Sequence, residues 1–326
     1  PLLATRVDGA VMRVSIKNPP VNLLNVGMVR ELFGLVGRLT VDPSIKVVVF
    51  DSAVPDFFIA HFDATEFAAS STDPAAKGRY DEINILQSLT TCIGNLPQIT
   101  IAEVNGVCRG GGLEMILGMT MRFASRSARF CIPETSLGFL PCGGGMTRLA
   151  MMCGPARALE VTLSGRDFSG EEAQQYGIVN RALVDDELRA YVDTLARRIA
   201  LRPAHAIAFN RDVIKRTFAS MADSLFEGFA AENDAMRASV QQGFMPRANE
   251  ALIQAGQTRE NEIDLPATID RILKDQAGFR LGPFELLDLT ALDVSHPVME
   301  SIYRQYYEEP RYRPSVITAQ RLAAGA

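Results

Sequence analysis

The stretch ITIAEVNGVCRGGGLE at residues 99–114 decides the fold. Its first six residues form an apolar run, as expected of a strand buried on both faces between helices. The glycines at 110–112 can bring bare backbone N–H groups close to a ligand, because no Cβ blocks the approach. Helical spacing follows from Leu113 to Met121, and such a helix directs the positive end of its dipole at a bound oxygen anion.

Similar elements lie on both sides of this stretch. Residues 11–16 alternate like a half-buried strand, residues 25–39 carry apolar side chains at helical spacing, and residues 46–51 form another apolar run. A short strand-like piece follows at 121–124. Alternation of strands and helices predicts an α/β architecture with right-handed crossovers.

The pattern becomes almost wholly helical beyond Pro155. Periodic segments occupy residues 156–163, 169–176, 187–201 and 204–217, and Ser169 is a plausible helix cap. A polar stretch at 256–261 reads as a linker, and an aromatic, proline-rich tail follows it. We therefore place a boundary near residue 255. It divides residues 1–255 (a core of 1–200 and a helical region of 201–255) from residues 256–326.

Composition excludes several classes of protein. The 326 residues carry a net charge of −5 with no basic block, which argues against nucleic-acid binding but allows an anionic small molecule. Five cysteines without a CxxC pair indicate free thiols, and three histidines without metal-ligand spacing indicate no metal site. The sequence shows no signal peptide and no apolar run of the ~20 residues that span a bilayer. These features predict a cytoplasmic protein without a membrane span.

Two glutamates beside glycine-bearing loops are the candidate acid/base groups. Glu114 comes two residues after the last glycine of the triplet, and Glu134 follows Pro133 in an apolar context. Burial without a cationic partner raises the pKa of a carboxyl group, which suits a general acid near neutral pH. Taken alone, the triple glycine also fits a tight structural turn, and Glu134 also fits a surface position at a strand end. A nucleotide-binding loop is poorly supported, because the spacing is not GxGxxG.

A third candidate element is the segment DFFIAHFD at residues 56–63, a strand end that turns into a loop. His61 within it could act as a general base. A histidine between alanine and phenylalanine is more often a packed or hydrogen-bonded structural residue.

Together, these segments resemble the crotonase (enoyl-CoA hydratase/isomerase) superfamily over about residues 5–255. The motifs that carry the resemblance are NPPVNLLN at 18–25, AEVNG at 102–106 with its GGG-x-Glu extension, the Pro-Glu and Gly-Gly-Gly region of 129–148, LSGR at 163–166, and AQQYGIVN at 173–180. Each motif is weak alone, but in this order they are highly specific.

The resemblance implies a spiral of ββα units with a helical trimerisation region, and a coenzyme A thioester as ligand. It assigns the thioester oxygen to the backbone N–H groups of Ala60 and Gly111, and the acid/base work to Glu114 and Glu134. It further assigns substrate or CoA contacts to Val21, Leu23, His61, Phe62, Asp63, Gly110, Pro133, Leu140 and Cys142. His61 with Phe62 and Cys142 depart from the family pattern, because small residues or glycine usually stand there.

The tail resembles part of the C-terminal helical domain of 3-hydroxyacyl-CoA dehydrogenases, through segments within 264–289 and 297–315. That domain normally follows a nucleotide-binding domain, but this chain has no GxGxxG segment, so we expect no NAD. The tail is then a helical element for packing or oligomerisation, or alternatively a wall of the CoA site.

These inferences favour a 2-enoyl-CoA hydratase that assembles as a homotrimer or a dimer of trimers. The alternatives are enoyl-CoA isomerisation, a lyase or hydrolase reaction of the same superfamily, and a catalytically silent acyl-CoA-binding or assembly protein.

Overall fold

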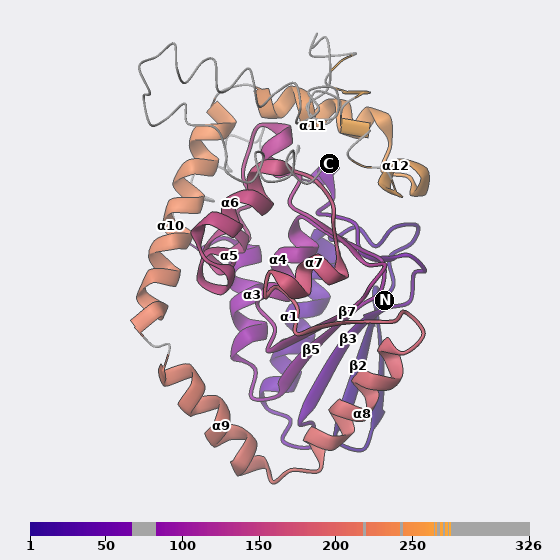
Figure 1. The fold of residues 1–326 in the computed structure, drawn as a ribbon, viewed down its shortest axis with the longest axis vertical. Coiled ribbons are helices and arrows are strands. Elements are labelled where there is room, and N and C mark those ends of the chain that lie inside the picture. The colour runs from indigo at the N-terminus through magenta and orange to yellow at the C-terminus, as the bar shows by residue number, and fades with distance from the viewer. Residues whose placement is uncertain are drawn as a thin grey trace, which may run out of the picture. The chain divides into compact units, whose positions relative to one another are not determined.

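A computed structural model describes residues 1–66, 83–217, 220–241 and 244–263, with scattered residues from 265 to 274. The chain divides into two compact units, Pro1–Thr268 and Ile269–Ala326. The first unit contains the two sheets and the helices labelled in Figure 1. Most of the tail, including the segments at 276–289 and 297–315 noted in the sequence, lies outside the described residues.

The larger sheet has six strands in the order β1-β2-β3-β5-β7-β10. β1 is antiparallel to β2, and the remaining neighbours are parallel. The strands are β1 (Leu3–Asp8), β2 (Val11–Ile16), β3 (Val47–Ser52), β5 (Ile99–Val104), β7 (Met121–Ser125) and β10 (Arg181–Leu183). The predicted α/β architecture is therefore confirmed, with the apolar runs forming the central strands.

A smaller sheet has the order β4-β6-β8-β9, with strands β4 (Phe57–Ile59), β6 (Val107–Arg109), β8 (Arg129–Cys131) and β9 (Phe168–Ser169). Consecutive strands along the chain alternate between the sheets, so β3 and β4, β5 and β6, and β7 and β8 each contribute one strand to each sheet. A helix follows each pair: α3 (Ile85–Asn95), α4 (Gly111–Leu117) and α5 (Gly145–Cys153). This is the expected spiral of ββα units.

Strand β3 is buried on both faces because helices cover both sides of the larger sheet. Val48 and Phe50 belong to the apolar cluster that includes α1, α3 and α4, whereas Val47 and Val49 pack with α8. Alternate side chains of one strand thus enter two different cores, which explains why its sequence is continuously apolar.

Local sequence signals account for the helix starts. Helix α1 (Val26–Thr40) begins where the Asn25 side chain accepts the N–H of Met28. Helix α7 (Gly170–Gln175) has a complete capping box between Ser169 and Glu172, which confirms the cap predicted at Ser169.

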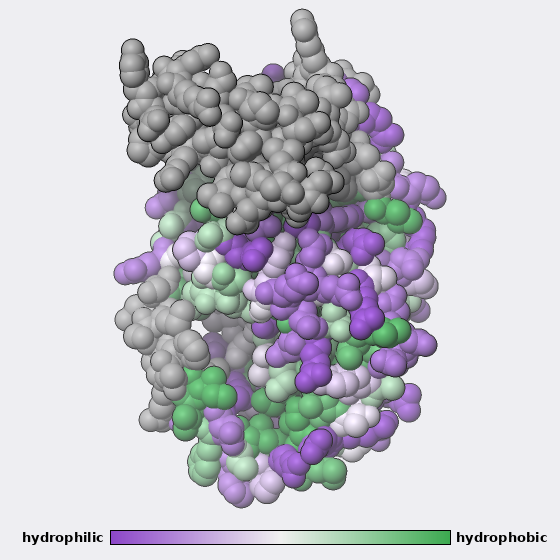
Figure 2. All heavy atoms as spheres, in the orientation of Figure 1, coloured by the Kyte–Doolittle hydropathy of each residue, from purple (hydrophilic) through white to green (hydrophobic). Residues whose placement is uncertain are grey.

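The C-terminal half of the first unit is helical. It contains α6 (Pro155–Ser164), α8 (Leu188–Ala200), α9 (Ala204–Thr217), α10 (Ser220–Gln241), α11 (Phe244–Ala255) and α12 (Arg259–Ile263). In Figure 1, α9 and α10 follow one edge of the unit. Figure 2 shows apolar residues over the lower part of this face, and α9 exposes Phe209, Val213 and Ile214.

Two local predictions need correction. Helix α4 ends at Leu117 rather than Met121, because Gly118 caps it and Met121 already pairs with Ile101 as part of β7. Strand β1 was not predicted, since most of its side chains are exposed and give little apolar signal.

Close packing of α4 against β4 requires glycine at position 112, and the same glycine-to-alanine change at two positions tests this. A Cβ at Gly112 would lie 2.6 Å from Ile59 Cβ, whereas a Cβ at Gly37 of α1 would meet nothing within 4 Å. We expect Gly112→Ala to lower the free energy of unfolding by about 1–3 kcal/mol through overpacking. Gly37→Ala should raise it by about 0.5–1 kcal/mol, because alanine favours a helix over glycine. Chemical denaturation measures both values, and equal effects would contradict this account of Gly112.

Candidate active site

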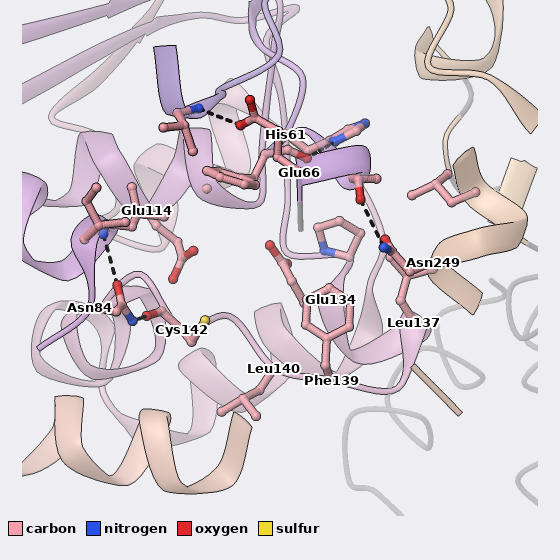
Figure 3. Close-up of a pocket in the computed structure, with 18 of the residues that line it drawn as sticks. His61, Glu66, Asn84, Glu114, Glu134, Leu137, Phe139, Leu140, Cys142 and Asn249 are labelled. Carbon is pink, nitrogen blue, oxygen red and sulfur yellow. Dashed lines mark hydrogen bonds between the residues drawn. The ribbon is translucent and has the colours of Figure 1, made fainter. Parts of the chain in front are cut away.

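A cavity of about 450 Å³ lies at the glycine-rich start of α4. Figure 3 shows Glu114 and Glu134 on opposite sides of this cavity, with Phe139 and Leu140 along its lower edge. The residues that line it are Val26, Arg30, His61, Phe62, Ala64, Glu66, Asn84, Ile85, Leu86, Gly111, Glu114, Pro133, Glu134, Leu137, Phe139, Leu140, Cys142, Asn249, Leu252 and Leu265.

Glu114 projects from α4 and is held by main-chain amides. Its Oε1 accepts the N–H groups of Gly143 at 2.7 Å and Gly145 at 2.9 Å, and the residue is only 3% exposed. Burial raises the pKa of Glu114 well above its usual value, and the nearby carboxylates of Glu134 and Glu232 raise it further. The two amides oppose this shift without reversing it. Glu114 is therefore a fixed carboxyl group whose protonated form is favoured by burial and by the neighbouring carboxylates.

Glu134 begins the short 3₁₀ helix η2 (Glu134–Leu137) on the opposite wall of the cavity. Burial raises its pKa to about 7, although the charge on His61 works in the other direction. Its Oε2 is buried and has no hydrogen-bond partner among the described residues. In Figure 3 the carboxyl groups of Glu114 and Glu134 point into the same space. The sequence prediction that these two side chains converge therefore agrees with the geometry.

Gly110 allows Glu134 to approach the backbone. Its φ of 48° lies in the left-handed region, and a Cβ there would sit 2.6 Å from Glu134 Oε1. A side chain at this position would displace the carboxyl group, so glycine is needed for both conformation and space.

A second carboxylate network holds the loop that binds Glu114. Glu232 of α10 accepts the N–H groups of Gly144 and Thr147, each at 2.9 Å, and a bond of 3.1 Å from Gln87. These contacts fix the start of α5, where the Gly143 and Gly145 amides face Glu114. Sequence analysis missed Glu232 because it lies in a helix more than 100 residues from Glu114.

The thioester-oxygen donor assigned to Ala60 needs correction. The Ala60 N–H donates to the carbonyl of Val21 at 3.2 Å, and Ala60 does not line the cavity. The next residues pair with Leu24, which donates to the carbonyl of His61 and accepts the N–H of Asp63. The N–H of Phe62 therefore faces away from Leu24, and no acceptor for it is found within the described part of the chain.

Gly111 offers a second amide at the same place, for which the described residues supply no acceptor. It is the first residue of α4, where N–H groups lack partners inside the helix. A Cβ at Gly111 would lie 3.5 Å from Phe62 Cβ, so the two backbones are neighbours. The structure thus brings the amides of Gly111 and Phe62 together at the cavity wall, in place of Gly111 and Ala60.

The remaining predicted contacts divide into two groups. His61, Pro133, Leu140 and Cys142 line the cavity with Phe62. The others do not line it: Val21 is buried in a small apolar cluster, Leu23 packs against that cluster, Asp63 bonds to Gln257, and Gly110 lies behind Glu134.

Several lining residues carried no sequence signal. Asn84 donates to the carbonyl of Cys142 at 2.6 Å, and Asn249 of α11 donates to the carbonyl of Ala64 at 3.1 Å. Arg30 is exposed on α1, and Phe139 and Leu265 belong to the apolar wall. These residues reach the cavity from distant segments, so only the folded chain reveals them.

Among the residues that the structure describes, no group of three or more His, Cys, Asp or Glu side chains is arranged to hold a metal ion. Within the same residues, no helix combines the length and apolar character needed to cross a bilayer. The five cysteines are free thiols.

Comparison with known proteins adds independent information. The family model of enoyl-CoA hydratase/isomerase matches residues 6–245, and that of the 3-hydroxyacyl-CoA dehydrogenase C-terminal domain matches residues 240–326. A carnitinyl-CoA dehydratase from Proteus mirabilis is 32% identical over 218 residues, which cover 66% of this chain and 80% of that protein.

Solved structures are also similar. A provisionally named enoyl-CoA hydratase from Streptomyces avermitilis has 35% identity and a TM-score of 0.74, and the match covers 84% of this chain and 99% of that chain. An enoyl-CoA hydratase from Bacillus anthracis has 25% identity and a TM-score of 0.62, with 70% of this chain and 90% of that chain covered.

The raised pKa of Glu134 predicts a pH-dependent cost to stability. Its pKa is about 7 in the folded protein against an ordinary 4.5, so the folded state holds more protons between these values. Stability from this group therefore falls as pH rises through that window. We expect Glu134→Gln to be more stable than the parent at pH 8 by about 1–3 kcal/mol, and equal to it at pH 4. Denaturation at both pH values tests this, with exposed Glu250→Gln as the control. A pH-independent difference would contradict it.

Proposed function

The chain belongs to the enoyl-CoA hydratase/isomerase family, and on that premise we propose that it adds water to a 2-enoyl-CoA to give a 3-hydroxyacyl-CoA. The observation that carries the proposal is that the Glu114 and Glu134 carboxyl groups face one cavity beside the amides of Gly111 and Phe62. Water oxygen bonds to the β-carbon, one water proton passes to a carboxylate, and a proton is delivered to the α-carbon. The reaction involves no oxidation, so it requires no NAD.

The two amides are proposed to bind the thioester oxygen. Attack at the β-carbon moves negative charge onto that oxygen and forms an enolate. Fixed backbone donors need no reorganisation to stabilise this charge, and each contributes about 10²–10³ in rate in comparable sites. The start of α4 also directs its dipole at the same point.

We assign different roles to the two carboxyl groups. The Gly143 and Gly145 amides favour the ionised form of Glu114, which leaves its second oxygen to hold and deprotonate water. Glu134 has an unbonded oxygen and a pKa raised to about 7, so it is suited to carry the proton for the α-carbon. A pair of neighbouring carboxyl groups that share one proton provides an acid and a base at once.

The residues that line the cavity suggest where the acyl group and the CoA phosphates of the substrate bind. Leu137, Phe139, Leu140, Leu252 and Leu265 form an apolar surface suited to a hydrocarbon acyl group. Arg30 is exposed at the same cavity and is the candidate partner of a CoA phosphate.

Comparing crotonyl-CoA and longer enoyl-CoAs with carnitinyl-CoA separates a hydrocarbon substrate from a charged one. Loss of enoyl-thioester absorbance measures hydration, and its gain measures dehydration.

Replacing either glutamate tests the assignment. We expect Glu114→Gln and Glu134→Gln each to lower kcat by about 10²–10⁴, because each loses acid or base assistance but keeps its volume. Binding of an acyl-CoA, measured by calorimetry, should change little. Glu232→Gln does not serve as a control, since Glu232 holds the same loop, so exposed Glu250→Gln is used instead. Unchanged turnover in both variants would show that the two glutamates have no catalytic role, and absence of turnover in the parent would leave a binding protein. Isomerisation of a 3-enoyl-CoA without hydration would favour an isomerase.

We further propose that the protein assembles as a homotrimer or a dimer of trimers. We also propose a reducing, cytoplasmic location, which the free cysteines support. The exposed apolar side chains of α9 support the assembly. Val213→Asp should shift sedimentation toward smaller species, because it charges this surface. Val41→Asp, an identical change at an exposed residue away from α9, should not. A stable monomer in the parent protein would contradict the proposal.

A further inference from the structure

His61 and Glu262 form a buried ion pair beside the candidate active site. His61 Nε2 lies 2.8 Å from Glu262 Oε1, and its Nδ1 lies 2.8 Å from the carbonyl oxygen of Phe62. The two side chains are only 9% and 1% exposed. A carbonyl can only accept, so Nδ1 must carry a proton, and the second proton is shared between Nε2 and the carboxylate. The imidazole therefore ties the backbone of Phe62 to α12.

Residues in α12 and just before it also contact the rest of the loop that contains His61. Gln257 Oε1 accepts the N–H of Ala64 at 3.1 Å, and its Nε2 donates to Asp63 Oδ1 at 3.0 Å. Arg259 donates to the carbonyl of Pro55 at 3.1 Å and lies over the Phe57 ring. This segment therefore contacts residues before and after Phe62 in the loop.

The segment also contacts the strand that leads to the glycine triplet. Arg109 is fully buried, pairs with Asp167, and donates to the backbone carbonyl of Glu262. Arg109 immediately precedes Gly110 and Gly111. A few residues beyond Glu262, Leu265 is 2% exposed and lines the cavity. Residues 257–263 therefore form hydrogen bonds close to both candidate oxyanion amides, and Leu265 contributes to the cavity wall.

We propose that residues 257–263, together with Leu265, are a working part of the active site, in which the His61–Glu262 pair is a positioning element that holds the Phe62 amide toward the thioester oxygen. This inference rests on the proposed function, because the role of the Phe62 amide belongs to that proposal. It assigns a role to a segment that the sequence had marked as a linker, and it explains the unusual histidine in the loop.

The charges around His61 give the pair a second effect. Glu262 faces it from α12, Asp63 from its own loop, Arg109 from β6 and Glu134 from η2. Burial alone lowers the pKa of His61, but the charge and hydrogen bond of Glu262 outweigh burial and Arg109, so the net pKa is raised. The imidazolium in turn lowers the pKa of Glu134. Loss of the Glu262 charge leaves burial dominant, so His61 becomes neutral and the pKa of Glu134 rises.

The test compares Glu262→Gln with Glu260→Gln, the same substitution at an exposed position of the same helix. A cinnamoyl-CoA thioester serves as the probe, because its absorption band moves to longer wavelength when its carbonyl oxygen accepts strong hydrogen bonds. We expect Glu262→Gln to lose most of the shift that the parent produces and to lower kcat by ~10–100-fold, as expected for a misplaced catalytic group. The alkaline limb of its pH–rate profile, where Glu134 loses the proton it delivers, should move to higher pH. Glu260→Gln should match the parent in all three measurements.

The outcomes separate the two proposals. A full band shift and an unchanged pH profile in Glu262→Gln would overturn the positioning role, whatever its effect on stability. A parent protein that shifts the band but does not hydrate enoyl-CoA would overturn the reaction and leave the positioning role supported. Absence of any shift in the parent would overturn both. If Glu262→Gln fails to fold, Gln257→Ala removes one anchor of the loop and should reduce the shift in the same direction.

Discussion

Close backbone packing at Gly110–Gly112 is the constraint on which the site depends. Gly112 lets α4 lie against Ile59 of β4, Gly110 leaves room for the Glu134 carboxyl group, and Gly111 lies beside Phe62. A Cβ at Gly110 or Gly112 would lie 2.6 Å from its neighbour and break the contact. Because α4 starts at this turn, the same three residues also determine where Glu114 points. The glycines therefore position both the amides and the carboxyl groups of the candidate site.

The arrangement has an energetic cost that the surrounding structure offsets. Burial of two carboxyl groups disfavours their ionised forms, and Glu134 has an oxygen without a partner among the described residues. The amides of Gly143 and Gly145 compensate Glu114, and Glu232 in turn holds the adjoining amides of Gly144 and Thr147. Such a site favours protonation changes near neutral pH at the expense of stability.

Much of this could be predicted from the sequence, because the signals were local or carried by the family resemblance. The apolar run at β3 and the cap at Ser169 each follow from a short window of residues. The convergence of Glu114 and Glu134 followed from their flanking glycines and the order of motifs. The direction in which a backbone N–H points could not be predicted from such local signals. Whether Ala60 or Phe62 faces the cavity depends on how residues 61–63 pair with Leu24. Glu262 was missed for a different reason, since it directly follows the polar stretch 256–261, whose composition resembles a linker.

Arg109 shows that the end of a family match need not coincide with the end of a structural unit. The enoyl-CoA hydratase/isomerase match ends at residue 245, yet the guanidinium of Arg109 donates to the carbonyl of Glu262. A chain truncated at the family border would leave this fully buried cation short of one acceptor. It would also remove Leu265 and expose the apolar wall to water. The first compact unit accordingly continues past the end of this family match, to Thr268.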